Sequence, residues 1–152
     1  MLIKTHLMVS LLLALLLLPF VEYKLIFLVF VFVATYIPDV DSRFSSMGHK
    51  KVARVLQFFT KHRGVIHSFT FLLVITLILV LFFPIVSLGF FVGYSSHLLA
   101  DSFTIDGIRP FYPLKNISRG GIATGGVFEK TLFISLFLIN LVLISVWLVS
   151  IF

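Results

Sequence analysis

The feature that most constrains this chain is a series of five apolar segments that together cover most of its length. We expect one helix in each of them, at about residues 3–20, 24–37, 65–83, 85–101 and 131–152. A membrane-spanning helix needs roughly 17 to 25 apolar residues, and the third and fifth segments reach that length. The apolar stretches of the others are near or below it, so those helices would borrow flanking residues or thin the bilayer.

The composition favours lipid as the solvent around these helices. Of the 152 residues, 60% are hydrophobic and 12% are charged, whereas soluble proteins average about half and a quarter. A soluble core of this composition would leave no polar shell, and the length excludes a second soluble domain. The chain is therefore predicted to be all-α, a single membrane domain over residues 1–152 built as an integral membrane helical bundle of about five short transmembrane helices.

Prolines and charges separate neighbouring apolar segments. Pro19, Glu22 and Lys24 divide the first from the second, and Pro84 divides the third from the fourth. A single helix through the first three of these residues would bury charges in lipid, so each pair of segments predicts a hairpin. The first segment follows Lys4 as a signal peptide would, but no small-x-small cleavage site follows it, so we expect it to be a retained span.

Two polar segments complete the chain. Residues 48–61 predict one interfacial amphipathic helix that lies on an anionic membrane face, and His49 within it is given no role at a site. Residues 102–130 hold prolines and two glycine pairs, which predict an irregular loop. The apolar stripe of the interfacial helix is Val52, Val55, Leu56 and Phe59, and Lys50, Lys51 and Arg54 lie off it.

Basic residues lie almost entirely on one side of the predicted topology. Two consecutive hairpins put the N-terminus, residues 39–64 and residues 102–130 on the same side, with eleven of the twelve Lys and Arg residues and only Lys24 opposite. The positive-inside rule makes that side cytoplasmic and places the C-terminus across the inner membrane. Topology and anionic lipid headgroups thus explain the net charge of +6, and no nucleic acid partner is expected.

Histidines and aspartates gather at this same cytoplasmic face. They belong to the start of the first helix, the end of the second, the start of the third and the end of the fourth. The chain has no cysteine, so a metal would be held by nitrogen and oxygen. The candidate metal ligands are His6, Asp39, Asp41, His62, His67, His97 and Asp101.

The spacing of these residues suits metal binding. His97 and Asp101 are four residues apart and share one helix face. Asp39 and Asp41 follow Pro38, and two carboxylates at that spacing in an extended turn could bridge two cations. One catalytic zinc takes about three protein ligands, so this larger set is compatible with one or two ions. The expected cofactor is a divalent metal, with Zn favoured and Mn or Fe as alternatives.

Ordinary explanations exist for several of these residues. His6 could lie at headgroup level, Asp41 could cap a helix, and His62 could belong to the basic lipid-facing patch. His97 with Asp101 is harder to explain in that way, because ionisable side chains at the end of an apolar helix need a partner or water.

Several motifs occur in a fixed order along the first three quarters of the chain, about residues 5–113. The pieces are Thr5-His6-Leu7, Pro38-Asp39-Val40-Asp41-Ser42, His62-Arg63-Gly64 with Ile66-His67-Ser68, and Gly93-Tyr94-Ser95-Ser96-His97-Leu98-Leu99-Ala100-Asp101. In these motifs the chain resembles the YdjM-like family of inner-membrane metal-dependent hydrolases. The resemblance implies a small multi-helix membrane protein with a divalent-metal hydrolytic site at the seven candidate ligands.

The leading functional hypothesis is a hydrolase that cleaves an ester or phosphoester at the cytoplasmic membrane face. Asp39 and Asp41 are candidate catalytic residues, although any of the three aspartates in the ligand set could act as the general base. Arg63, with Arg109, could pair with a phosphate, because a guanidinium presents two donors to an oxyanion. A site at headgroup depth suggests a lipid or lipid-linked substrate.

Two hypotheses from other classes remain open. A metal transporter or carrier would use the same ligands transiently, although transporters place their sites near the bilayer midplane, where this chain has no acid or histidine. A structural membrane protein would use the metal to staple helices that span poorly alone.

Overall fold

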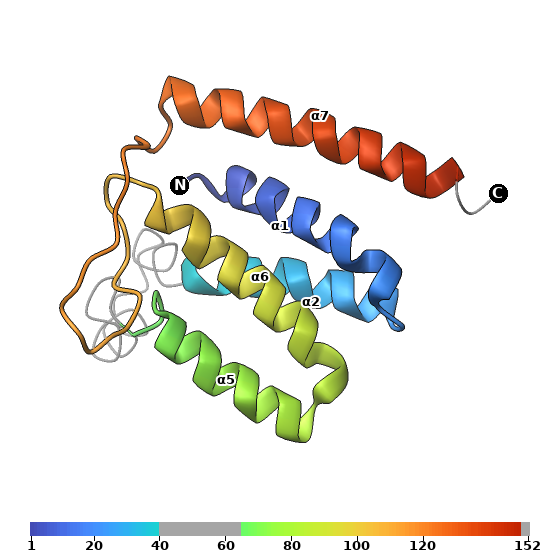
Figure 1. Cartoon of the computed structure of the whole chain (residues 1–152), viewed down its shortest axis with the longest axis horizontal. Coiled ribbons are helices and arrows are strands. Elements are labelled where there is room, and N and C mark those ends of the chain that lie inside the picture. The colour runs from blue at the N-terminus through green and yellow to red at the C-terminus, as the bar shows by residue number, and fades with distance from the viewer. Residues whose placement is uncertain (40–64, 150–152) are drawn as a thin grey trace, which may run out of the picture.

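The computed structural model describes residues 1–39 and 65–149, and the described part of the chain is helical (Figure 1). Its five α-helices are α1 (Ile3–Leu17), α2 (Lys24–Tyr36), α5 (Phe69–Phe82), α6 (Pro84–Ser102) and α7 (Val127–Val149). The 3-10 turns η1 (Leu18–Phe20) and η2 (Ile37–Asp39) extend α1 and α2. The described ranges contain no β-strand, only two isolated bridges in the loop after α6. The predicted all-α class is confirmed for these ranges.

Two helical segments, Ile3–Phe20 and Val127–Val149, are long and apolar enough to cross a membrane. The finer prediction of about five transmembrane helices stays a prediction. The predicted interfacial helix at residues 48–61 lies outside the described residues.

Proline chemistry explains the two breaks between helices. Pro19 lies in η1, and α1 has ended by then because proline cannot donate the next hydrogen bond of the helix. Pro84 is the first residue of α6. The backbone N–H at this position has no acceptor within the helix, so the N–H that proline lacks costs no helical hydrogen bond. Both breaks fall where the sequence predicts them.

The start of α5 differs from the prediction. The helix begins at Phe69 rather than at residue 65, because the Ser68 side chain caps it by accepting a hydrogen bond from Phe71 N at 3.2 Å. His67 therefore lies in the turn before α5 rather than on the helix.

The start of α7 also differs from the prediction. This helix begins at Val127, four residues before the expected residue 131, so the loop after α6 covers residues 103–126 rather than 102–130. The extra turn contains the buried Glu129.

Helix α6 is central to the bundle and packs against α1, α2 and α5, while α7 packs against α1 at the outer edge (Figure 1). One core cluster joins α1, α2 and α6 around Phe27 and Val31, and a second joins α5 and α6 around Leu72 and Tyr94. Many large apolar side chains of α5 and α7 are exposed.

Two glycines let α6 approach α2 closely. A Cβ at Gly89 would lie 2.7 Å from the Phe27 carbonyl oxygen, and a Cβ at Gly93 would overlap the Val31 carbonyl. Small residues four apart on one face are the usual means by which helices come this close in membranes.

The candidate ligands that the structure describes all lie at one end of the bundle. The starts of α1, α5 and α7 and the ends of α2 and α6 lie together at the left of Figure 1. The loop of residues 103–126 lies at this end too, and Phe69 N donates to its Pro110 carbonyl at 2.8 Å. This arrangement brings the candidate ligands within reach of one another.

Candidate metal centre

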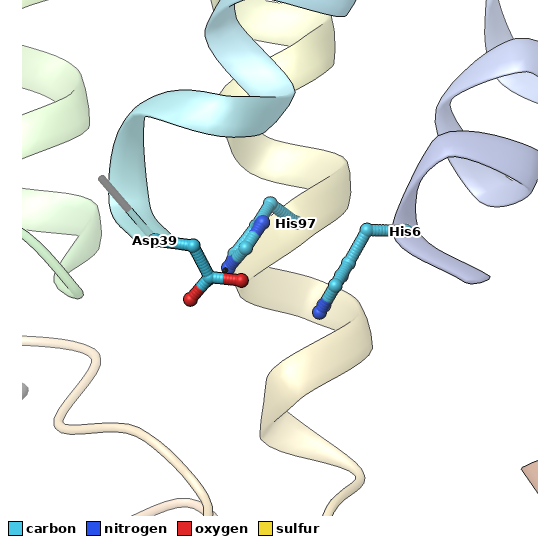
Figure 2. Close-up of side chains that lie close together, drawn as sticks. All are labelled: His6, Asp39 and His97. Carbon is cyan, nitrogen blue, oxygen red and sulfur yellow. Dashed lines mark ion pairs between the residues drawn. The ribbon is translucent and has the colours of Figure 1, made fainter. Parts of the chain in front are cut away.

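Five of the predicted ligands come together at this end of the bundle. His6 lies in the first turns of α1, Asp39 ends η2, His67 lies just before α5, and His97 and Asp101 occupy the last turns of α6. Figure 2 shows His6, Asp39 and His97 reaching the same space from three different segments. The cluster thus joins residues that are up to ninety-five positions apart in the sequence.

The geometry centres on two carboxylates and three imidazole Nε2 atoms. Asp101 Oδ1 lies 3.2 Å from Nε2 of His6, and its Oδ2 lies 3.6 Å from Nε2 of His97 and 4.0 Å from that of His67. Asp39 Oδ1 lies 3.7 Å from Nε2 of His67 and 3.8 Å from that of His97. Both carboxylates therefore bridge His67 and His97.

The imidazole rings are packed against one another. The rings of His6 and His97 stack with centroids 3.9 Å apart and planes within 8°. His67 meets His97 edge-on, with centroids 5.7 Å apart. His6 and His97 are fully buried and His67 nearly so, so the three rings are shielded from water by the protein.

Several nitrogen atoms of these rings have no hydrogen-bond partner among the described residues. They are both ring nitrogens of His6, Nε2 of His97 and Nδ1 of His67. His6 Nε2 lies 3.2 Å from Asp101 Oδ1 without making a hydrogen bond to it. Buried polar atoms are nearly always paired, and leaving one unpaired costs about 1 to 3 kcal/mol. The described part of the cluster is therefore short of partners for its ring nitrogens.

A divalent metal ion fits this shortage. Zinc with bonds of about 2.1 Å holds its ligand atoms about 3.4 Å apart in a tetrahedral site. The separations between Nε2 and carboxylate oxygen in this cluster, from 3.2 to 4.0 Å, bracket that value. Two triads have ligand atoms that all lie within 4.8 Å of one another: His6, Asp39 and His97, and His67, His97 and Asp101.

A backbone contact sets the tautomer of His97. Its Nδ1 lies 2.9 Å from the Thr35 carbonyl oxygen. A carbonyl oxygen only accepts, so Nδ1 carries a proton in this contact, and Nε2 is the ring nitrogen that faces the two carboxylates. Metal-binding histidines are commonly oriented by such a bond from the other ring nitrogen.

The charge on Asp39 is favourable for metal binding. Burial alone would raise the pKa of this carboxyl, but the neighbouring imidazoles of His67, His97 and His6 lower it below its ordinary value. The side chain is thus ionised at neutral pH and is 30% exposed. Asp101 is buried and also accepts from the Met1 amine at 2.7 Å.

The first turn of α1, which carries His6, is fixed by Glu129 of α7. Glu129 Oε1 accepts from Leu2 N at 2.6 Å, and Oε2 accepts from Gly125 N at 2.6 Å. The Glu129 carboxylate thus accepts from a backbone N–H at the start of α1 that has no acceptor within the helix. The same carboxylate also ties down the end of the loop before α7 through Gly125 N. Sequence reasoning missed this role, because the partner of Leu2 lies 127 residues away.

We expect Glu129→Gln to destabilise the protein by about 1 to 3 kcal/mol, because the amide offers one acceptor oxygen where the carboxylate offers two. Denaturation in mild detergent measures the change. The chain's other glutamate, Glu22, is exposed, so Glu22→Gln is a matched control that should leave stability unchanged. Equal stability of both variants would show that the two short backbone contacts of Glu129 contribute little.

The other predicted site residues are placed differently or not described. Asp41, His62 and Arg63 lie outside the described residues, and Arg109 is exposed in the loop after α6. Ligation by any of the seven candidates, and the number of ions, stay predictions.

Comparison with known proteins gives two matches. The family described as YdjM inner membrane protein matches residues 1–152. The uncharacterized protein YvsG of Bacillus subtilis (strain 168) is 32% identical over 85 residues, which make up 53% of this chain and 53% of YvsG. The chain thus matches about half the length of that curated relative. No solved structure matches the chain.

Proposed function

Since this chain belongs to the YdjM inner membrane protein family, we propose that it is a membrane-bound hydrolase that uses a divalent metal held by its His/Asp cluster. The observation that carries the proposal is the convergence of three buried Nε2 atoms on two carboxylates, with His97 common to both triads. Nitrogen and oxygen donors of this kind suit Zn, Mn or Fe. When bound, such a metal supplies Lewis-acid activation of water and of an ester or phosphoester oxygen.

The residues of the cluster divide into two roles in this proposal. His6, His67, His97 and Asp101 hold the metal, because they are buried and face one another. Asp39 is the more exposed of the two described carboxylates and is ionised. One oxygen of its carboxylate can complete the triad with His6 and His97, and the other supports a role in accepting a proton from water at the side where substrate arrives. Asp41 and Arg63 remain candidates for a second base and for phosphate binding.

The proposed setting is the cytoplasmic face of the inner membrane. We propose a multi-pass arrangement in which the N-terminus and the site face the cytoplasm and the C-terminus lies opposite, on the strength of the eleven basic residues assigned to that side. A cluster at the helix ends lies near lipid headgroups, which supports a lipid or lipid-linked ester or phosphoester as substrate. The same basic residues favour anionic headgroups as neighbours.

The test is turnover by the metal-loaded protein in mild detergent. We expect lipid phosphoesters or esters to be hydrolysed after loading with Zn, Mn or Fe, and Asp39→Asn to lower kcat by at least about 100-fold, as loss of a general base does. Asp106→Asn, in the exposed loop after α6, is the matched control and should keep full activity.

Two outcomes would replace the proposal with another function. If metal raises the thermal stability and no ester or phosphoester is turned over, the cluster is a structural staple. If metal crosses proteoliposome membranes and no substrate is hydrolysed, the protein is a transporter.

A further inference from the structure

A layer of three hydroxyl groups lies one helical turn deeper in the bundle than the His/Asp cluster. It consists of Ser10 on α1, Thr35 on α2 and Ser96 on α6, and all three side chains are fully buried. The Thr35 hydroxyl donates to Ser10 Oγ at 2.8 Å, and Ser10 Oγ lies 2.6 Å from Ser96 Oγ. These contacts join three helices that are otherwise packed by apolar side chains.

The donors and acceptors of this layer form a directed chain. The Ser96 hydroxyl donates to the Gly93 carbonyl at 2.8 Å, so its oxygen accepts the proton of Ser10. Ser10 in turn accepts from Thr35, whose hydroxyl also lies 2.7 Å from the Val31 carbonyl of its own helix. Every hydroxyl proton thus has an acceptor, which a buried polar group needs. The chain leaves no free donor for a ligand, so it is suited to holding helices.

Each member of the layer is close in sequence to a candidate metal ligand. Ser10 follows His6 by four residues on α1, Thr35 precedes Asp39 by four at the end of α2, and Ser96 immediately precedes His97. The Thr35 carbonyl also accepts the bond from His97 Nδ1. The three helices that supply one triad are therefore tied to one another within one turn of their ligands.

We propose that Ser10, Thr35 and Ser96 form a positioning network that sets the relative height and rotation of α1, α2 and α6, and thereby the metal affinity of the His/Asp cluster. Apolar contacts alone allow helices to slide and rotate, whereas hydrogen bonds between helices fix their register. A metal site needs its ligands held to within about 0.5 Å. The inference rests on the proposed metal binding, but not on hydrolysis.

The test compares metal affinity in variants that lose one hydroxyl each. Thr35→Val keeps the shape of the side chain, and Ser10→Ala and Ser96→Ala are equally small changes. We expect each to weaken Zn²⁺ or Mn²⁺ binding about 10- to 100-fold, as loss of outer-shell partners does, measured by competition with a chromogenic chelator. The matched control is Ser95→Ala, which should bind metal like the wild type. Ser95 neighbours Ser96, but within the described residues its hydroxyl donates only to the Val92 carbonyl of its own helix.

Two further measurements separate positioning from general stability. Thr35→Ser restores the hydroxyl and should bring the affinity back to near the wild-type value. The double variant with Ser10→Ala and Thr35→Val should bind little worse than either single variant, because one break already interrupts the chain. Ser96→Ala gives an independent measurement should Thr35→Val fail to fold.

The possible results distinguish this inference from the proposed function. If the wild type binds metal and all three hydroxyl variants match Ser95→Ala, the positioning network is refuted while the metal site stands. If Thr35→Ser remains as weak as Thr35→Val, the hydroxyl is not the cause, which also refutes the network. If the wild type takes up no metal under any loading condition, the proposed function and this inference fail together.

Discussion

His97→Ala should abolish stoichiometric metal binding. Loss of a residue that only supports a ligand lowers metal affinity by up to roughly 100-fold, and loss of a ligand should lower it further. The reason is that His97 is the one residue shared by both triads of the described cluster. Its Nε2 lies 3.8 Å from Asp39 Oδ1 and 3.6 Å from Asp101 Oδ2, so its loss leaves neither triad complete. Elemental mass spectrometry of the purified protein measures the metal content directly.

The control for this variant is His49→Ala, because the sequence analysis gives His49 no role at the site. It should keep the metal content of the wild type. Wild-type metal content in His97→Ala would contradict the assignment of both triads at once.

The two triads also allow the number of ions to be counted. His6 belongs to one triad and His67 to the other. If two ions bind, His6→Ala and His67→Ala should each lose one. If one ion binds across the cluster, each variant should lower the affinity for that single ion.

The end of the bundle at which the site forms could be predicted from sequence. Pro19 and Pro84 are strong local signals that stop a helix wherever it lies, so the breaks between helices follow from them. Once the breaks are placed, the direction of each helix follows, and His6, Asp39, His67 and His97 must fall at one end. No long-range contact was needed for this step.

The contacts that complete the site could not be predicted in the same way. The start of α7 depends on Glu129 meeting Leu2 N, and the tautomer of His97 depends on the Thr35 carbonyl of another helix. These are tertiary contacts, and no local pattern encodes them. The sequence holds one weak signal of such a tertiary contact. Ser10 lies one turn from His6 within an apolar helix, and a buried hydroxyl there needs a hydrogen-bond partner on another segment.

The close approach of α2 and α6 predicts a large effect of the substitution Gly93→Ala on stability. Helix propensity alone predicts that Gly93→Ala stabilises the protein by about 1 kcal/mol, because alanine is the better helix former. The structure predicts the opposite sign, since the added Cβ would overlap the Val31 carbonyl and would lie 2.8 Å from its carbon. The two helices must then separate, and overpacking of this kind costs about 1 to 3 kcal/mol. Denaturation in mild detergent measures the change.

The consequence should reach the metal site, because α2 carries Thr35 and leads directly into η2, which ends at Asp39. The Gly93 carbonyl is also the acceptor that ends the hydroxyl chain. Gly93→Ala should therefore lower metal affinity as well as stability. Gly121→Ala is the matched control, since a Cβ there meets no atom of the described residues within 4 Å, and it should be neutral or slightly stabilising. Stabilisation by Gly93→Ala would show that helix propensity outweighs the contact, and that α2 and α6 do not need to lie this close for the ligands to meet.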